Sequence, residues 1–226
     1  MNRTILVLIG ISCAVITATG IMWYNNLVIS EIMVTRQQLY DKDPDMRLNA
    51  INKLFRFGDK ASIPEITKLL QDKDLWVRKT AICALGWIGA KESIPEITKL
   101  LQDKYEIIRV LSVDALARLN AKKAIPEIIR LLQDNEQRVR TEAVHALIDL
   151  NAKEAIPDIT KLLHDDEWGV RWSTIEALGY LNAKEAISEI KKLLNDRNEH
   201  IRKQAEETLR KLGVPAEEIE KAKEEK

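Results

Sequence analysis

The sequence has few of the residues that usually mark catalytic, metal or disulfide sites. Its 226 residues include two cysteines, Cys13 and Cys83, and three histidines. The cysteines lie in unrelated settings, one in an apolar run and one in a predicted helix, which argues against a disulfide framework. No His-Glu-x-x-His or Cys-x-x-Cys motif is present, and His145, His164 and His200 stand at different positions of the repeat described below. The sequence therefore predicts no metal, no cofactor and no catalytic residues.

An excess of charge of either sign is also absent. Lys plus Arg and Asp plus Glu are each 35, which gives a formal net charge of +0 at pH 7. A chain without a net positive charge does not attract polyanions over a distance, so this balance disfavours nucleic-acid binding through bulk charge. A local charged patch is still compatible with it.

What the sequence does contain is a repeat. Four of its six prolines, Pro64, Pro95, Pro126 and Pro157, recur every 31 residues, each inside a near-copy of Ile-Pro-Glu-Ile-x-Lys-Leu-Leu-Gln-Asp. Each copy joins two stretches with helical apolar periodicity, and such a helical hairpin cannot bury its apolar face without stacking on neighbours. The period predicts an all-α solenoid.

Charged residues follow the same period. Six arginines and six aspartates recur every 31 residues, and each aspartate lies six residues before its arginine. Because arginine can bridge to a carboxylate or carbonyl of its own or the next repeat, we interpret them as a structural ladder. The members are Arg47, Arg78, Arg109, Arg140, Arg171 and Arg202, with Asp41, Asp72, Asp103, Asp134, Asp165 and Asp196.

Small residues form two further columns. Alanines in the second helix, Ala84, Ala115, Ala146 and Ala177, are interpreted as packing residues that let neighbouring helices approach closely. Just past that helix, glycine or asparagine is always present, and both tolerate the left-handed backbone that often ends a helix. This column is Gly58, Gly89, Asn120, Asn151, Asn182 and Gly213.

The units resemble HEAT repeats, and more specifically the short HEAT-like repeats first associated with phycobilisome lyase subunits. The motif residues are shown by Ala155-Ile156-Pro157, Leu162-Leu163, Val170-Arg171 and Ala177-Leu178-Gly179. The resemblance implies two-helix units in a right-handed superhelix with the second helices lining the concave side, and it names no partner. We expect a repeat domain over residues 27–216, then a charged tail over residues 217–226. The repeat domain is expected to contain six units, at residues 31–61, 62–92, 93–123, 124–154, 155–185 and 186–216.

The longest uncharged run is at the N-terminus. Residues 5–24 carry no charge, and a helix of this length spans about 30 Å, the hydrocarbon thickness of a bilayer. Arg3 precedes the run, so we expect residues 1–26 to form an apolar membrane anchor with the N-terminus in the cytoplasm and the repeats outside it. Two alternatives stay open: a signal peptide cleaved after Gly20, which would leave a secreted or periplasmic protein, and an apolar cap on a cytosolic solenoid.

Columns that vary between repeats are the candidates for binding. They lie one, five and nine residues after each ladder arginine, on one face of the second helix. From Trp87 to Tyr180 this face would extend about 30 Å, at roughly 10 Å per helix. Partner-binding candidates on it are Lys79, Trp87, Asp114, Arg118, His145, Asp149, Trp172, Glu176 and Tyr180.

Aromatic residues make up only 5% of the chain, so their positions on this face are informative. Trp87, Trp172 and Tyr180 either anchor a partner or fold down over the stack, and the sequence leaves both readings open. Trp76 and Trp168, near the turn between helices, are expected to cover the edge of the core.

Three functions fit the sequence to different degrees. The first is a non-enzymatic, membrane-tethered and monomeric scaffold that binds a protein or peptide through its concave face. The resemblance to lyase subunits implies a second, a lyase-like or chaperone-like factor for a chromophore or other hydrophobic ligand. A third, a HEAT-like enzyme acting on nucleic acid, is disfavoured by the balanced charge.

Overall fold

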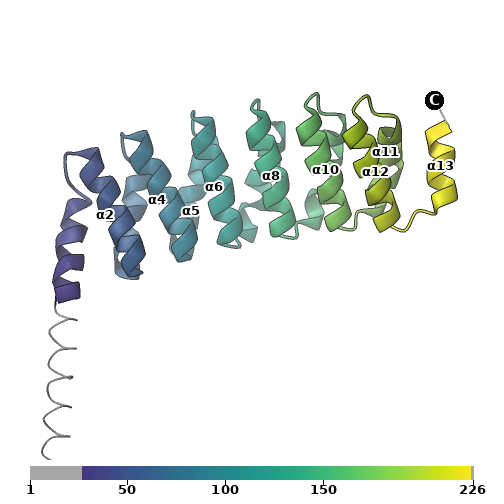
Figure 1. Cartoon of the computed structure of the whole chain (residues 1–226). Coiled ribbons are helices and arrows are strands. Elements are labelled where there is room, and N and C mark those ends of the chain that lie inside the picture. Colours follow the sequence, from purple (N-terminus) through teal and green to yellow (C-terminus); the bar gives the residue numbers. More distant parts are fainter. Residues whose placement is uncertain (1–26, 225–226) are drawn as a thin grey trace, which may run out of the picture.

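A computed structural model describes residues 27–224 of the chain as a single row of helices (Figure 1). Helical residues 27–38 begin the row, and α13 (Ala216–Glu224) ends it. Between residues 27 and 224 there is no β-strand. The predicted all-α solenoid is confirmed.

Continuous and interrupted helices alternate along the row. The continuous second helices are α2 (Pro44–Phe57), α4 (Leu75–Ile88), α6 (Glu106–Arg118), α8 (Gln137–Asp149), α10 (Trp168–Tyr180) and α12 (Glu199–Lys211). The first helices contain α3 (Ile63–Lys68), α5 (Ile94–Lys99), α7 (Ile125–Arg130), α9 (Ile156–Lys161) and α11 (Ile187–Lys192). One-turn 3-10 helices precede and follow these: η1 (Lys60–Ser62), η2 (Leu69–Gln71), η3 (Lys91–Ser93), η4 (Leu100–Gln102), η5 (Lys122–Ala124), η6 (Leu131–Gln133), η7 (Lys153–Ala155), η8 (Leu162–His164), η9 (Lys184–Ala186) and η10 (Leu193–Asn195).

Proline and aspartate set the limits of each first helix. Pro64 lies in the first turn of α3, where a missing backbone N–H removes no helical hydrogen bond. Asp72 follows η2 with extended backbone, at φ −60° and ψ 145°, and so stops the helix. The predicted end of the first helix at Asp72 is confirmed.

The glycine and asparagine column ends each second helix as predicted. All six residues have positive φ, from 51° at Asn151 to 90° at Gly213. An asparagine is tolerated in this left-handed conformation at lower cost than a β-branched residue, and glycine at no steric cost.

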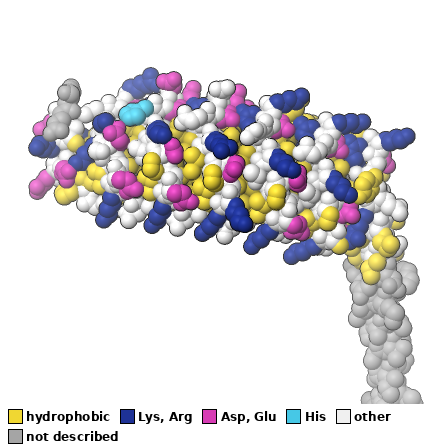
Figure 2. All heavy atoms as spheres, turned by 180° about the vertical axis from the view of Figure 1, so that it is seen from behind, with side chains coloured by type: hydrophobic (Ala, Val, Ile, Leu, Met, Phe, Trp, Pro, Cys, Tyr) yellow, Lys and Arg dark blue, Asp and Glu magenta, His cyan; other side chains and the backbone are white. Residues whose placement is uncertain are grey.

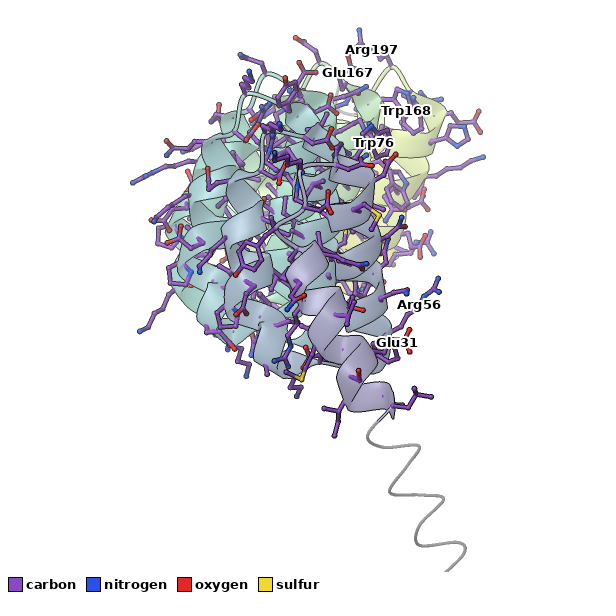
Figure 3. All side chains as sticks on the ribbon, turned by 90° about the vertical axis from the view of Figure 1, so that its left-hand side faces the viewer. Glu31, Arg56, Trp76, Glu167, Trp168 and Arg197 are labelled. Atoms are coloured by element: carbon purple, nitrogen blue, oxygen red, sulfur yellow. The ribbon has the colours of Figure 1, made fainter. Side chains whose placement is uncertain are left out.

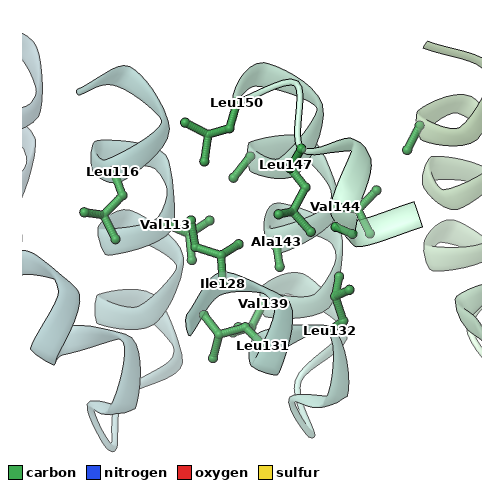
Figure 4. Packing of buried hydrophobic residues seen from close by; sticks show 14 of the residues in the cluster. Val113, Leu116, Ile128, Leu131, Leu132, Val139, Ala143, Val144, Leu147 and Leu150 are labelled. Atoms are coloured by element: carbon green, nitrogen blue, oxygen red, sulfur yellow. The ribbon is translucent and has the colours of Figure 1, made fainter. Parts of the chain in front are cut away.

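The apolar core runs through the whole row, and small residues let neighbouring second helices pack closely. Each second helix from α2 to α12 packs against the next one. Figure 4 shows Val113 of α6 beside Ile128 of α7, with Ala143 of α8 beyond. A Cβ atom built on Gly86 of α4 would lie 3.1 Å from the Cβ atom of Ala115. The four column alanines are buried, which confirms their packing role.

The arginine and aspartate columns form the predicted ladder. Arg47 donates from Nε and Nη2 to the carboxylate of Asp72 in the next unit, both at 2.7 Å, and from Nη1 to the carbonyl oxygen of Asp41 at 2.8 Å. The same two-pronged pairing joins Arg109 to Asp134 at 2.8 and 2.7 Å. It also occurs in Arg140–Asp165 and Arg171–Asp196. Because the partners are 25 residues apart, each pair fastens one unit to the next.

One position departs from the ladder. Arg78 donates from Nη1 to the carbonyl oxygen of Asp72 at 2.7 Å, but it makes no ion pair with Asp103, and its buried Nε has no hydrogen-bond partner. Its guanidinium instead lies 5.5 Å from the ring centroid of Tyr105. The predicted ladder thus has four inter-unit carboxylate pairs, and at Arg78 it has only the bond to a carbonyl oxygen of the same unit.

The segment predicted as a charged tail folds against the end of the row. Ile219 of α13 is fully buried, and Lys191 pairs with Glu218. Lys223 of the same helix lies 2.8 Å from Glu206 of α12. Helix α13 thus covers apolar surface at the C-terminal end, which a terminal repeat would otherwise expose.

The structure contradicts the predicted localisation. Among residues 27–224, no helix is long and apolar enough to cross a membrane. The second helices have 13 or 14 residues, whereas a span requires about 20 apolar ones. The proposed N-terminal helix over residues 1–26, with its uncharged run at residues 5–24, lies outside the described residues. The membrane tether and the placement of the repeats outside the cytoplasm are therefore not retained.

Candidate functional site

The second helices present one continuous surface, here called the second-helix face. It consists of the exposed or half-exposed side chains of α2, α4, α6, α8, α10 and α12, which pack side by side. All nine residues predicted as partner-binding candidates belong to these helices. Two hollows lie on this face, and both are lined by aromatic rings.

The N-terminal hollow lies between α2 and α4 and has a volume of about 290 Å³. Its lining is Asn52, Phe55, Trp76, Lys79, Thr80, Cys83, Ala84 and Trp87. Trp76 and Trp87 remain 64% and 62% exposed. Each ring has a cation over it: Lys79 Nζ lies 4.0 Å from the Trp76 centroid, and Arg118 Cζ lies 4.0 Å from the Trp87 centroid. The predicted residues Lys79, Trp87 and Arg118 are thus brought together here.

The C-terminal hollow lies among α8, α10 and α12 and has a volume of about 540 Å³. It is lined by Thr141, Trp168, Gly169, Trp172, Ser173 and His200. Trp168 is 52% exposed, and its ring centroid lies 6.3 Å from that of His200. Trp172 is half-buried and packs against the core. This hollow therefore has one fixed aromatic wall and one wall exposed to solvent.

Trp168 also borders a third hollow of about 470 Å³ on the side of the turns. It is lined by Asp166 and Glu167, together with Arg197, which donates to the carbonyl oxygen of Asp166 at 3.0 Å. Viewed along the row, Trp76 and Trp168 project at the same edge of the molecule, with Glu167 and Arg197 nearby (Figure 3). The two exposed tryptophans thus share a side although they belong to α4 and α10.

The prediction that Trp76 and Trp168 cover the edge of the core is wrong. Both are the most N-terminal tryptophans of their helices, and their rings point away from the apolar stack to line hollows. Of the three aromatic residues predicted on the binding face, Trp87 and Tyr180 also stay exposed, while Trp172 packs on the core. Tyr180 is 61% exposed, with Lys211 Nζ 4.0 Å from its centroid.

The centre of the second-helix face is acidic. Asp114 Oδ2 accepts from Arg118 Nε at 2.9 Å, and Glu142 and Asp149 lie close enough to act on the same guanidinium. Burial, followed by the charges of Asp114 and Asp149, raises the pKa of Glu142 above its ordinary value. Of these three carboxylates, only Asp114 forms an ion pair with Arg118.

The remaining predicted candidates line neither hollow. His145 and Glu176 are half-buried on α8 and α10, and Asp149 is exposed at the end of α8. No group of three or more His, Cys, Asp or Glu side chains within the described part of the chain could hold a metal ion. Burial raises the pKa of the Cys83 thiol, which lowers the fraction of reactive thiolate.

Several lining residues were missed from the sequence: Asn52, Phe55, Thr80, Thr141 and His200. Asn52 and Thr141 lie in the variable columns, five residues after Arg47 and one after Arg140, but are not among the predicted candidates, whereas Phe55, Thr80 and His200 lie outside these columns. For His200 the sequence signal is a histidine in the first turn of a second helix, and for Asn52 and Thr141 it is membership of the variable columns.

The repeats are those of a known family. HEAT repeats match residues 32–111, 94–173 and 156–223. The chain belongs to the HEAT-repeat family. A comparison with curated proteins finds no match.

Solved structures share the fold of this HEAT-repeat chain. The complex of CpcE and CpcF of phycocyanin lyase from Nostoc is 21% identical, with a TM-score of 0.59 over 80% of this chain and 77% of that chain. A designed armadillo repeat protein in complex with the peptide (KR)4 is 23% identical, with a TM-score of 0.61 over 81% and 100%. Another designed armadillo repeat protein is 24% identical, with a TM-score of 0.54 over 79% and 98%. At these identities the likeness shows the fold alone.

Proposed function

We propose that this HEAT-repeat protein is a non-enzymatic scaffold that binds a protein or peptide partner through the second-helix face. In this proposal residues 27–216 form a monomeric repeat domain of six units, wound as a right-handed superhelix with the second-helix face on its concave side. Two neighbours in fold, the CpcE and CpcF complex and the designed protein with its (KR)4 peptide, are themselves complexes with protein or peptide.

The observation that carries the proposal is the pair of aromatic hollows. Trp76, Trp87 and Trp168 are each more than half exposed, although burying a tryptophan is among the larger gains of free energy available to a side chain. Tryptophans are also strongly enriched among the residues that dominate binding energy at protein interfaces. Solvent-exposed tryptophans in hollows are thus the expected unbound form of interface anchors.

The side of the row turned away in Figure 1 carries both charged and apolar side chains. Figure 2 shows Lys, Arg, Asp and Glu side chains of both signs along its whole length, with hydrophobic side chains exposed between them. Interspersed charges of both signs are typical of a surface in contact with solvent. The support for recognition on the second-helix face is therefore its exposed tryptophans.

The proposal is tested by affinity capture with the full chain. Wild type is compared with two variants, Trp76→Ala with Trp87→Ala, and Trp168→Ala, by quantitative mass spectrometry of proteins retained from an extract of the native cells. Because interface tryptophans commonly contribute 2 kcal/mol or more, we expect at least about a 30-fold weaker affinity for the partner in each variant.

Tyr40→Ala is the matched control, since Tyr40 is 63% exposed but lines neither hollow. Circular dichroism and melting should be the same for all four proteins, because none of the substituted rings lies in the core. Equal retention of every partner by wild type and the tryptophan variants would contradict the proposal.

A further inference from the structure

The second-helix face has an order along its length that suggests what it binds. Most of the lining of the N-terminal hollow belongs to α4 and most of that of the C-terminal hollow to α10. The carboxylates of Asp114, Glu142 and Asp149 belong to α6 and α8, the helices between these two, and Glu176 belongs to α10 itself. From α4 to α10 there are three helix-to-helix steps of about 10 Å, which separate the hollows by roughly 30 Å.

Charge is distributed unevenly along this length. At the N-terminal hollow, Lys79 and Arg118 already lie over the two tryptophan rings. A basic side chain of a partner would meet like charges there, so this hollow fits an apolar or aromatic side chain. The C-terminal hollow is lined by Trp168, Trp172 and His200 with no lysine or arginine, and it also fits a large apolar group.

The stretch between the hollows has unpaired negative charge. Asp114 is paired with Arg118 at 2.9 Å. Glu142, Asp149 and Glu176 form no ion pair with any lysine or arginine in residues 27–224. Arg138 at the start of α8 is directed to Glu106 at 3.6 Å. Basic side chains of a partner would therefore be complementary to the centre of the face.

We propose that the second-helix face binds an extended protein segment that has two large apolar side chains about 30 Å apart and lysine or arginine between them. At about 3.3 Å per residue, such a segment places its two apolar anchors about nine residues apart. This inference rests on the proposed scaffold function and adds the chemistry and spacing of the partner. The anchors fill the two hollows, and the basic residues face Glu142, Asp149 and Glu176.

The test uses synthetic peptides and the full chain. The first peptide carries two tryptophans about nine residues apart with lysine and arginine between them. A second replaces the basic residues by glutamate, and a third keeps the basic residues but replaces the tryptophans by alanine. Affinities are measured by anisotropy of a fluorescent label at low and at physiological salt.

We expect the first peptide to bind at least about tenfold more tightly than either of the others, with weaker binding at higher salt. Glu142→Gln with Asp149→Asn should lower its affinity about tenfold. Glu154→Gln, an exposed carboxylate of η7 outside the face, should leave it unchanged.

Two results would overturn the inference in distinguishable ways. If the glutamate peptide binds as well as the basic one and both need tryptophan, the hollows bind a partner but the charge assignment is wrong, and the proposed function stands. If none of the peptides binds, or tryptophan makes no difference, the anchor and spacing assignment fails, and the capture experiment decides the scaffold function separately.

Discussion

The pair formed by Arg47 and Asp72 illustrates how a charged residue can serve the stack. Burial by itself would raise the pKa of Asp72. Hydrogen bonds from Arg47 and from the backbone of Asp74, together with the charge of Arg47, lower it by more than burial raises it, so the net pKa is below the usual 3.8. A depressed carboxyl pKa stabilises the fold above the unfolded value, and this contribution is lost as pH falls through the folded pKa. Repeated charges of this kind hold neighbouring units together.

The pKa of Glu142 is shifted in the opposite direction, upward. Burial and the nearby carboxylates Asp114 and Asp149 raise its pKa above the usual 4.5, so its ionised form is disfavoured in the folded state. The associated loss of stability is full above the folded pKa and disappears as pH falls below the unfolded one.

Glu142→Gln is therefore expected to raise the free energy of unfolding at pH 7 and to have no effect below about pH 4. Urea unfolding followed by circular dichroism at pH 7 and at low pH measures the difference. Lower stability of the variant at pH 7 would show that the Glu142 carboxylate is held by a favourable interaction.

At the scale of helices, the closeness of neighbouring second helices depends on single small residues. A Cβ atom on Gly86 would lie 3.1 Å from the Cβ and 3.2 Å from the Cα atom of Ala115. The second of these is a backbone atom, so α4 and α6 could accept it only by moving apart. Gly169 of α10, by contrast, has no atom within 4 Å of its built Cβ position.

These two glycines make opposite predictions for the same substitution. Gly169→Ala should stabilise the protein by up to about 1 kcal/mol, because alanine has the higher helix propensity. Gly86→Ala should instead destabilise it, because overpacking typically costs about 1–3 kcal/mol. Denaturant midpoints of the two variants, measured side by side, check both signs, and a stabilising Gly86→Ala would mean that α4 and α6 are less tightly packed.

At the scale of the whole molecule, features that repeat were predictable and features that occur once were not. The left-handed backbone at Asn120 and the pairing of Arg109 with Asp134 followed from their columns, since stacking imposes the same requirement on every unit. The departure at Arg78 was not predictable in this way: its guanidinium lies 5.5 Å from the ring centroid of Tyr105, and no other unit has a tyrosine at that position.

The candidate site was predictable only in part for the same reason. The columns led to Lys79, Trp87 and Trp172, which line the hollows. The Trp76 ring lies under Lys79 of the same helix and the Trp168 ring lies near His200 of α12, and helical periodicity alone does not predict these contacts. The second-helix face could be predicted from the sequence, whereas the positions of its hollows depend on how the side chains of neighbouring units pack.

The most direct test of the central claim is hydroxyl-radical footprinting of the full chain with and without its captured partner. If the partner occupies the second-helix face, oxidation of Trp76, Trp87 and Trp168 should decrease several-fold in the complex, while oxidation of Tyr40 should stay the same. If the three tryptophans are oxidised equally in both states and protection falls on the opposite face, recognition through the second-helix face is contradicted.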